Sequence, residues 1–192
     1  MGGDLMALTP SEIVHGLATS LNLPMDTIGT LIRVHEQLWE LEDEARCPDA
    51  SDQTVAQCKR RIDQANASRH ALINAVDATL PNIELDSLGS LYQQTVGELI
   101  DCLVVLQLKV GNLQTLVSGQ RLGVTRREEC ARNLGMCHRK TQHLALVADQ
   151  LVTDLHAGRA MLPPRADPKL YLHAELRGLS GKFSSPGMGT HS

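Results

Sequence analysis

The amino-acid sequence predicts an all-α protein, an antiparallel bundle of four long helices with a short N-terminal helix and a C-terminal helical appendage. Three observations carry this prediction. Aromatic residues make up only 2% of the 192 residues, whereas strands favour aromatic and β-branched side chains. Long segments repeat apolar residues at spacings of three and four, which places those residues on one helical face. Motifs of the form Thr-x-x-Glu, typical of helix starts, precede three of these segments.

Proline and capping residues bound the first two predicted helices. Thr9-Pro10-Ser11-Glu12 is a capping box with proline at the first helical position, so a short helix begins here and stops at Leu23-Pro24. A long helix follows from about Asp26 to Arg46. One of its faces carries Ile28, Leu31, Ile32, His35, Leu38, Trp39 and Glu42, which recur at spacings of three and four.

The third helix is predicted from a cap at Ser51 or Asp52 to about Leu80, before Pro81. Its inward stripe is Val55, Lys59, Ile62, Asn66, Arg69, Ile73, Val76 and Leu80. Three of these residues are polar, and a buried charge is costly unless it is paired. An antiparallel pairing of the second and third helices would supply partners, because it places acidic residues beside basic ones. The expected pairs join Glu42 or Asp43 to Lys59, Arg60 or Arg69.

The fourth helix is predicted from the capping box Thr95-Val96-Gly97-Glu98 to about Val117, after a connector at 81–94 with a helical turn from Leu88 to Gln94. Apolar residues cover most of its sides, which indicates a buried helix. It nevertheless carries polar residues along one face. We expect this face to form a polar row inside the bundle, made of Glu98, Asp101, Lys109 and Asn112.

The fifth helix is predicted from the box Thr125-Arg126-Arg127-Glu128 to about Ala157, with Gly158 as its stop. Its seam is Cys130, Leu134, Cys137, Thr141, Leu144, Ala148, Leu151 and Leu155. The expected organisation is a flexible N-terminus at 1–8, a bundle domain at 9–160, an appendage at 161–177 and a disordered tail at 178–192.

Composition excludes several classes of function. The net charge of −4 gives no broad basic field, so nucleic-acid binding is not expected. No apolar stretch is long enough to span a membrane, and the first residues do not resemble a signal peptide. Five cysteines without a Cys-x-x-Cys motif indicate reduced thiols and a cytoplasmic location.

The sequence offers no established cofactor or metal motif. The glycine-rich nucleotide loops, the Gly-x-Ser-x-Gly elbow and the His-Glu-x-x-His zinc motif do not occur. Cys130, Cys137, His138 and His143 lie close in sequence, but Cys137 and His138 point about 100° apart on a helix. We therefore expect neither a metal nor a cofactor.

Two ordered motifs carry a resemblance to a known family. The first is Leu38-Trp39-x-x-Glu42-Asp43-x-Ala45-Arg46 followed by Lys59-Arg60-x-Ile62-Asp63-x-x-Asn66-x-x-Arg69. The second comprises Thr95, Gly97, Ile100, Asp101, Leu103, Val105, Leu106, Leu108 and Lys109. Over residues 28–157 the chain resembles an uncharacterised bacterial all-helical family, a domain of unknown function often encoded near glycosyltransferases in cell-envelope polysaccharide clusters. His35 departs from the asparagine that this resemblance implies.

The candidate site combines both motifs. Its residues are Trp39, Glu42, Asp43, Arg46, Lys59, Asn66, Arg69, Asp101 and Lys109. They either bind a polar ligand or form an ion-pair network that fixes how the helices pair. The leading functional hypothesis is a cytosolic accessory or binding protein, with a glycosyltransferase as the expected partner. The alternatives are a small enzyme acting on an anionic small molecule through the polar core, and a homodimeric scaffold.

Overall fold

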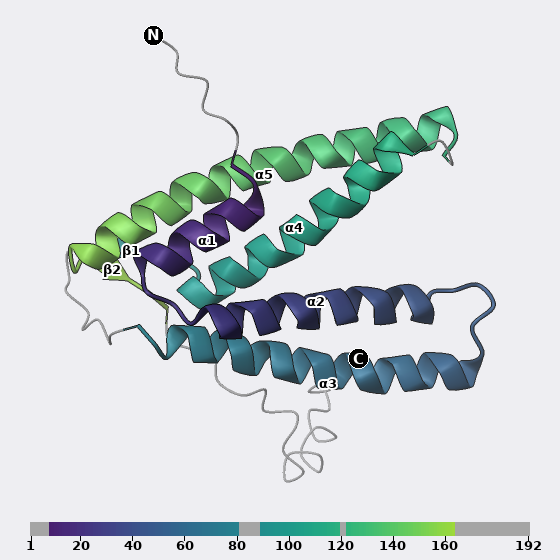
Figure 1. Cartoon of the computed structure of the whole chain (residues 1–192), viewed down its shortest axis with the longest axis horizontal. Helices are drawn as coiled ribbons and strands as arrows, with labels where there is room; N and C mark the ends of the chain where they lie inside the picture. The colour runs from purple at the N-terminus through teal and green to yellow at the C-terminus, as the bar shows by residue number, and fades with distance from the viewer. Residues whose placement is uncertain (1–7, 81–88, 120–121, 164–192) are drawn as a thin grey trace, which may run out of the picture.

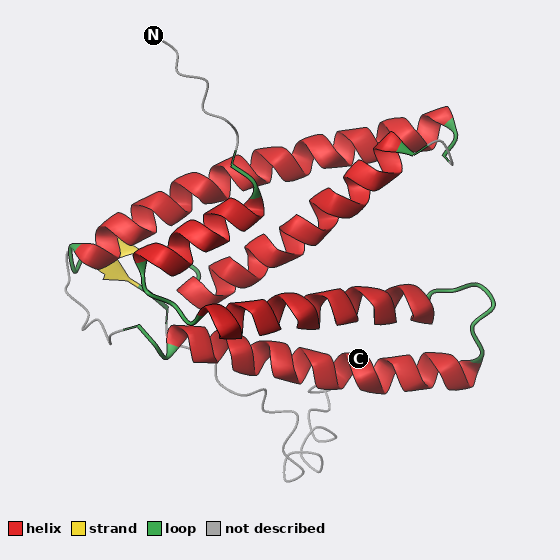
Figure 2. Cartoon of the chain, viewed as in Figure 1, coloured by secondary structure: helices red, strands yellow, loops and turns green. Residues whose placement is uncertain are grey.

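The computed structural model describes residues 8–80, 89–119 and 122–163. Helices account for most of these residues, and one pair of two-residue strands completes the secondary structure (Figure 2). The elements are α1 (Pro10–Ser20), α2 (Met25–Ala45), α3 (Asp52–Asp77), β1 (Ser90–Leu91), α4 (Val96–Ser118), α5 (Val124–His156) and β2 (Ala160–Met161). The predominantly helical class predicted from the sequence is confirmed.

Helix starts follow the predicted caps in three of four cases. Thr9 and Thr95 each accept a hydrogen bond from the backbone three residues on, and Glu12 and Glu98 accept one in return, so both capping boxes are formed. Ser51 caps α3. The box predicted at Thr125 is wrong: α5 begins at Val124 after Gly123, with no side-chain cap, and Thr125 already lies inside the helix.

The long helices form two hairpins, α2 with α3 and α4 with α5, and α1 packs against the second of them (Figure 1). The main core lies where the two hairpins meet. All five helices and Ala160 of β2 contribute to it. Away from this core the hairpins diverge toward their own closing loops (Figure 1). The arrangement as a single four-helix antiparallel bundle is therefore not confirmed.

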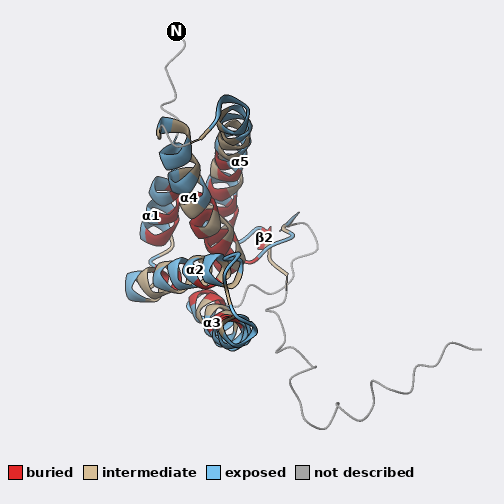
Figure 3. Cartoon of the chain, turned by 90° about the vertical axis from the view of Figure 1, so that its right-hand side faces the viewer, coloured by how far each residue is buried: buried red, intermediate tan, exposed pale blue. Residues whose placement is uncertain are grey.

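Burial is concentrated where the helices pack together, and the surfaces that face outward are exposed (Figure 3). The first half of α4 is enclosed, with Leu103 at 0% exposure, whereas Leu116 in its second half is 44% exposed. Lys109 and Asn112 are also exposed. The predicted polar row inside the bundle is thus wrong beyond Asp101, because the second half of α4 is largely exposed where the two hairpins diverge.

The outer part of the α2–α3 hairpin has a small core of its own. Leu41 packs there with Cys58 and Ile62, and these three residues form a cluster separate from the main core. In the first turns of α3 the predicted stripe residues Val55 and Lys59 are exposed, and Cys58 is the buried residue instead. The predicted inward stripe of α3 is therefore correct from Ile62 onward and wrong before it.

A close approach of two backbones joins the end of α3 to the start of α4. The Gly97 backbone N–H donates to Oδ1 of buried Asp77 at 2.7 Å. A Cβ atom at Gly97 would lie 2.5 Å from the carbonyl oxygen of Ile73. Only glycine leaves room for this contact, which fixes the level at which α4 crosses α3.

The segment after residue 88 departs from the helical turn predicted at Leu88–Gln94. Its residues 90–91 form β1, which pairs in parallel with β2, and Leu88 lies outside the described residues. The pairing joins segments 70 positions apart, Ser90 with Ala160, so local sequence could not indicate it. Apart from residues 161–163, the predicted C-terminal appendage and tail lie outside the described residues, as does the N-terminus before Leu8.

Candidate functional site

A buried carboxylate on α4 holds side chains from two other helices. Oδ1 of Asp101 lies 2.7 Å from Nε2 of His35 on α2 and 2.7 Å from Nε of Arg69 on α3. Oδ2 of Asp101 accepts a second hydrogen bond from Nη2 of Arg69 at 2.6 Å. Asp101 and His35 are each 6% exposed. We call His35, Arg69 and Asp101 the Asp101 network.

The electrostatics of the Asp101 network keep Asp101 and Arg69 charged. Burial raises the pKa of the Asp101 carboxyl. The hydrogen bonds and charges of Arg69 and His35 outweigh this effect and lower the pKa from 3.8 to about 2. The same hydrogen bond raises the pKa of Arg69, despite the cost of its burial. At neutral pH Asp101 is therefore an ionised carboxylate beside a charged guanidinium.

The ionised carboxylate also determines the tautomer of His35. A carboxylate without a proton can only accept hydrogen bonds, so Nε2 of His35 must carry the hydrogen. In the neutral ring this leaves Nδ1 as a hydrogen-bond acceptor. Nδ1 has no hydrogen-bond partner within the described residues. His35 thus presents a ring nitrogen, Nδ1, without a partner among the described residues, and Asp101 fixes its orientation from the opposite side of the ring.

His35 lies at the wall of a cavity of about 320 Å³ between α2, α3 and α4. We call it the His35 cavity. Its other lining residues are Leu38, Trp39, Glu42, Asp43, Arg46, Asn66, Val105 and Leu108. Glu42 and Arg46, four residues apart at the end of α2, form an ion pair in this lining, with Oε2 and Nη1 2.6 Å apart and both side chains substantially exposed. Such an exposed pair contributes little stability and can exchange its partners for a ligand.

The structure gathers most of the sequence-predicted site residues at this place. Arg69 and Asp101 are in direct contact, and Trp39, Glu42, Asp43, Arg46 and Asn66 line the His35 cavity. The nearness of α2 to α3 brings them together, since these helices pack along their length.

Two predicted residues do not join them. Lys59 is exposed and pairs with Asp63 on its own helix at 2.9 Å. Lys109 lies two turns beyond Asp101 and lines a different cavity, between α2, α4 and α5. The expectation that Lys109 converges with the other polar residues is therefore wrong, because Lys109 lies on the side of α4 that faces α5, whereas its neighbour Leu108 lines the His35 cavity.

The predicted cross-hairpin ion pairs also differ from the observed ones. Arg69 pairs with Asp101 rather than with Glu42 or Asp43. Between α2 and α3, Arg61 instead pairs with Glu44, at 3.9 Å and between exposed side chains. The charges of the hairpin thus lie on its surface, and the buried pairing is made with α4.

Comparison with known proteins places the chain in a family. Residues 25–163 match the family described as a protein of unknown function, DUF4254. The chain belongs to the DUF4254 family. The matched range begins at α2 and ends just after β2, so it includes the Asp101 network and the His35 cavity. Neither a curated protein nor a solved structure matches this chain.

The sequence places His35 on the face of α2 that carries Leu31 and Leu38, but it does not predict a role for His35 in the candidate site. Two signals were available: a histidine inside an apolar stripe, and its departure from the asparagine expected by resemblance. The sequence could not indicate that His35 pairs with Asp101, because the two residues lie 66 positions apart.

A second buried carboxylate was also missed. Asp154, near the end of α5, accepts hydrogen bonds from the hydroxyl of Tyr92 at 2.8 Å and from Arg159 at 2.9 Å. Hydrogen bonding, chiefly from Tyr92, lowers the pKa of Asp154 to about 2. Burial and the same contact raise the pKa of Tyr92 to about 12. These contacts tie β1 and the chain before β2 to α5, which is a structural role.

Other chemistry is sparse in the part of the chain that the structure describes. Within it, no three His, Cys, Asp or Glu side chains gather as a metal site would require. All five cysteines are free thiols. Among the described helices, none combines the length and the hydropathy that a membrane crossing needs.

Proposed function

We propose that this DUF4254 protein is a binding protein and that the His35 cavity is its ligand site. The observation that carries the proposal is the ring of His35, which Asp101 holds through Nε2 beside a cavity with further polar side chains and whose Nδ1 has no partner among the described residues. Small-molecule sites combine an apolar lining with a few convergent polar groups in this way. The cavity volume of about 320 Å³ is that of a small ligand.

The lining favours a neutral, hydroxyl-rich ligand such as a sugar unit. Glu42 and Asp43 supply acceptors for hydroxyl groups, and Asn66 supplies both a donor and an acceptor. The indole of Trp39 offers an apolar face for the C–H groups of a sugar ring. Arg46 is the one cation in this lining, and it is already paired with Glu42. An anion would therefore meet more negative than positive charge here.

The proposal extends to an accessory role in glycosyltransferase-dependent assembly of cell-envelope glycans, inside the bacterial cytoplasm. Its support is the resemblance of the Trp39 and Asp101 motifs to a family encoded near glycosyltransferases. A cavity suited to sugars agrees with such a role. The glycosyltransferase itself is the proposed protein partner.

Calorimetric titration with monosaccharides and nucleotide sugars tests the binding proposal. We expect one sugar class to bind with one-to-one stoichiometry. Loss of one hydrogen bond in Asp43→Ala or Asn66→Ala should weaken that binding about fivefold. Asp63→Ala is the matched control, because Asp63 is exposed on α3 and lies outside the cavity lining. If no sugar binds, or if all three variants bind alike, the proposal is wrong.

The second candidate is a small enzyme that uses His35 as a general base. A carboxylate that orients a histidine and stabilises its charged form is a recurring catalytic pair, and His35 with Asp101 has this geometry. His35→Asn tests it, since asparagine can still donate to Asp101 but cannot accept a proton from a hydroxyl group. The enzyme hypothesis expects His35→Asn to bind the sugar and to lose turnover. Binding without any turnover in the unsubstituted protein supports the binding role instead.

A further inference from the structure

A second cavity opens on the other side of Trp39, between α2, α4 and α5. It has a volume of about 460 Å³, and we call it the Lys109 cavity. Side chains such as Cys102, Leu106 and Met136 make most of its surface apolar. Its lining on α4 runs from Cys102 to Leu116, a rise of about 21 Å at 1.5 Å per residue. The cavity is therefore elongated and follows the groove between α4 and α5.

Two exposed lysines, Lys109 and Lys140, line this apolar cavity, and no carboxylate does. Within the described residues neither lysine forms an ion pair. Within the described residues, the ammonium groups of the two lysines are therefore not neutralised by a carboxylate.

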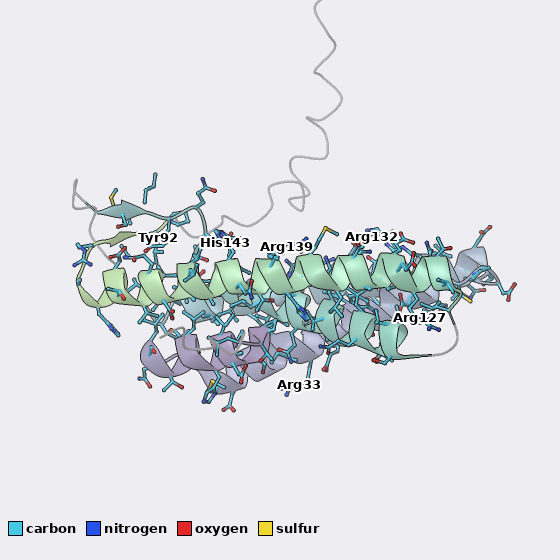
Figure 4. All side chains as sticks on the ribbon, turned by 90° about the horizontal axis from the view of Figure 1, so that it is seen from above. Arg33, Tyr92, Arg127, Arg132, Arg139 and His143 are labelled. Atoms are coloured by element: carbon cyan, nitrogen blue, oxygen red, sulfur yellow. The ribbon has the colours of Figure 1, made fainter. Side chains whose placement is uncertain are left out.

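The surrounding charge has the same sign. Residues 124–143 of α5 carry five Lys or Arg against two Glu, although the whole chain has a net charge of −4. Arg132 and Arg139 follow one another along this helix (Figure 4). Lys109 is the one charged residue of α4 between Cys102 and Ser118. The α4 and α5 sides of the groove are therefore net positive, which favours binding of an anion.

We propose that the Lys109 cavity binds one molecule of a long-chain alkyl phosphate, with the chain along the apolar groove and the phosphate held by Lys109 and Lys140. A phosphate monoester carries a charge of about −1.5 to −2 at neutral pH, which two ammonium groups match. A carboxylate would match only one of them. Trp39 of α2 closes the groove on its third side, so the space suits a single alkyl chain better than a helix about 10 Å across.

Fluorescence of Trp39 gives a direct readout, because Trp39 is the only tryptophan and lines the cavity. The probe is dodecyl phosphate below its micelle-forming concentration. We expect a saturable, one-to-one change in fluorescence, with weaker binding of octyl phosphate because less alkyl chain is buried. Dodecanol and dodecanoate should bind more weakly than dodecyl phosphate, because they offer less negative charge to the two lysines.

Variants at exposed positions keep the fold and separate the contributions. Lys109→Gln and Lys140→Gln should each weaken dodecyl phosphate binding about fivefold. Met136→Gln should weaken it by removing apolar surface from the groove. Lys59→Gln removes the same charge from an exposed position on α3, outside this cavity, and should leave binding unchanged. Asn66→Ala should also leave it unchanged, which separates this site from the proposed sugar site.

Several outcomes would overturn the proposal. They are equal binding of dodecanol or dodecanoate, an equal response to inorganic phosphate alone, and equal affinity of the Lys109→Gln, Lys140→Gln and Lys59→Gln variants. Binding only to vesicles of phosphatidylcholine and phosphatidylglycerol, without binding of the monomeric probe, would assign the positive charge beside the groove to a membrane surface and also overturn it.

Discussion

Arg69 and Asp101 join α3 to α4 through two parallel hydrogen bonds, from Nε to Oδ1 at 2.7 Å and from Nη2 to Oδ2 at 2.6 Å. Paired bonds between a guanidinium and a carboxylate are stronger and more directional than a single neutral hydrogen bond. Because His35 shares Oδ1, the same carboxylate also fixes α2. The network therefore sets how the first hairpin meets the second, and it holds one wall of the His35 cavity.

Asp101→Asn should lower the free energy of unfolding by about 2 kcal/mol, because the depressed pKa of Asp101 measures how strongly the fold stabilises its charge. Urea denaturation checks this value. Asp63→Asn is the control, since it removes an exposed pair with Lys59 and should change stability by no more than about 0.5 kcal/mol. Equal stability of the two variants would show that the Asp101 network adds nothing to the fold.

Acid should weaken the fold through Asp101. Its pKa is about 2 in the folded chain, below its ordinary value of 3.8, so the folded state holds the ionised form. This stabilisation is complete above about pH 5 and is lost as pH falls through 4 toward 2. Unfolding free energies measured across that range should therefore fall more steeply for the unsubstituted protein than for Asp101→Asn. The variant should keep some acid sensitivity, because the pKa of Asp154 is also lowered to about 2. Parallel curves would contradict the assignment.

Two glycines on α4 should respond in opposite directions to alanine. Gly97→Ala should destabilise the protein by about 1–3 kcal/mol, since the new Cβ would lie 2.5 Å from the carbonyl oxygen of Ile73. Gly111→Ala should stabilise it by about 0.5–1 kcal/mol, because alanine favours a helix and nothing lies within 4 Å of the new atom. Thermal unfolding of both variants tests the pair. A stabilised Gly97→Ala variant would mean that α3 and α4 do not approach this closely.

Leucines in the two halves of α4 should differ in how much stability their side chains contribute. Leu103→Ala should cost about 3 kcal/mol, because the side chain is fully buried in the main core. Leu116→Ala should cost less than about 1 kcal/mol, since this side chain is 44% exposed. Chemical denaturation of the two variants compares them directly. Similar losses would indicate that the hairpins pack together along their full length.

Much of the candidate site could be predicted from the sequence, although its chemistry could not. Glu42, Asp43, Asn66 and Arg69 were found because they share helical faces, and they lie at or beside the His35 cavity. Lys59 and Lys109 satisfied the same spacing and lie elsewhere. Helical spacing says which side of a helix a residue occupies. Helical spacing does not show how far along that side a neighbouring helix stays in contact.

The sequence by itself determined the helices of this protein, because capping boxes, proline breaks and apolar spacing act through residues only a few positions apart. Thr9 and Thr95 start their helices as predicted for that reason. Only the tertiary structure decided that the hairpins diverge, that β1 pairs with β2 and that Asp101 forms its hydrogen bonds with His35 and Arg69. Each of these depends on contacts between segments 32 to 70 positions apart, and such contacts follow from packing of the whole chain.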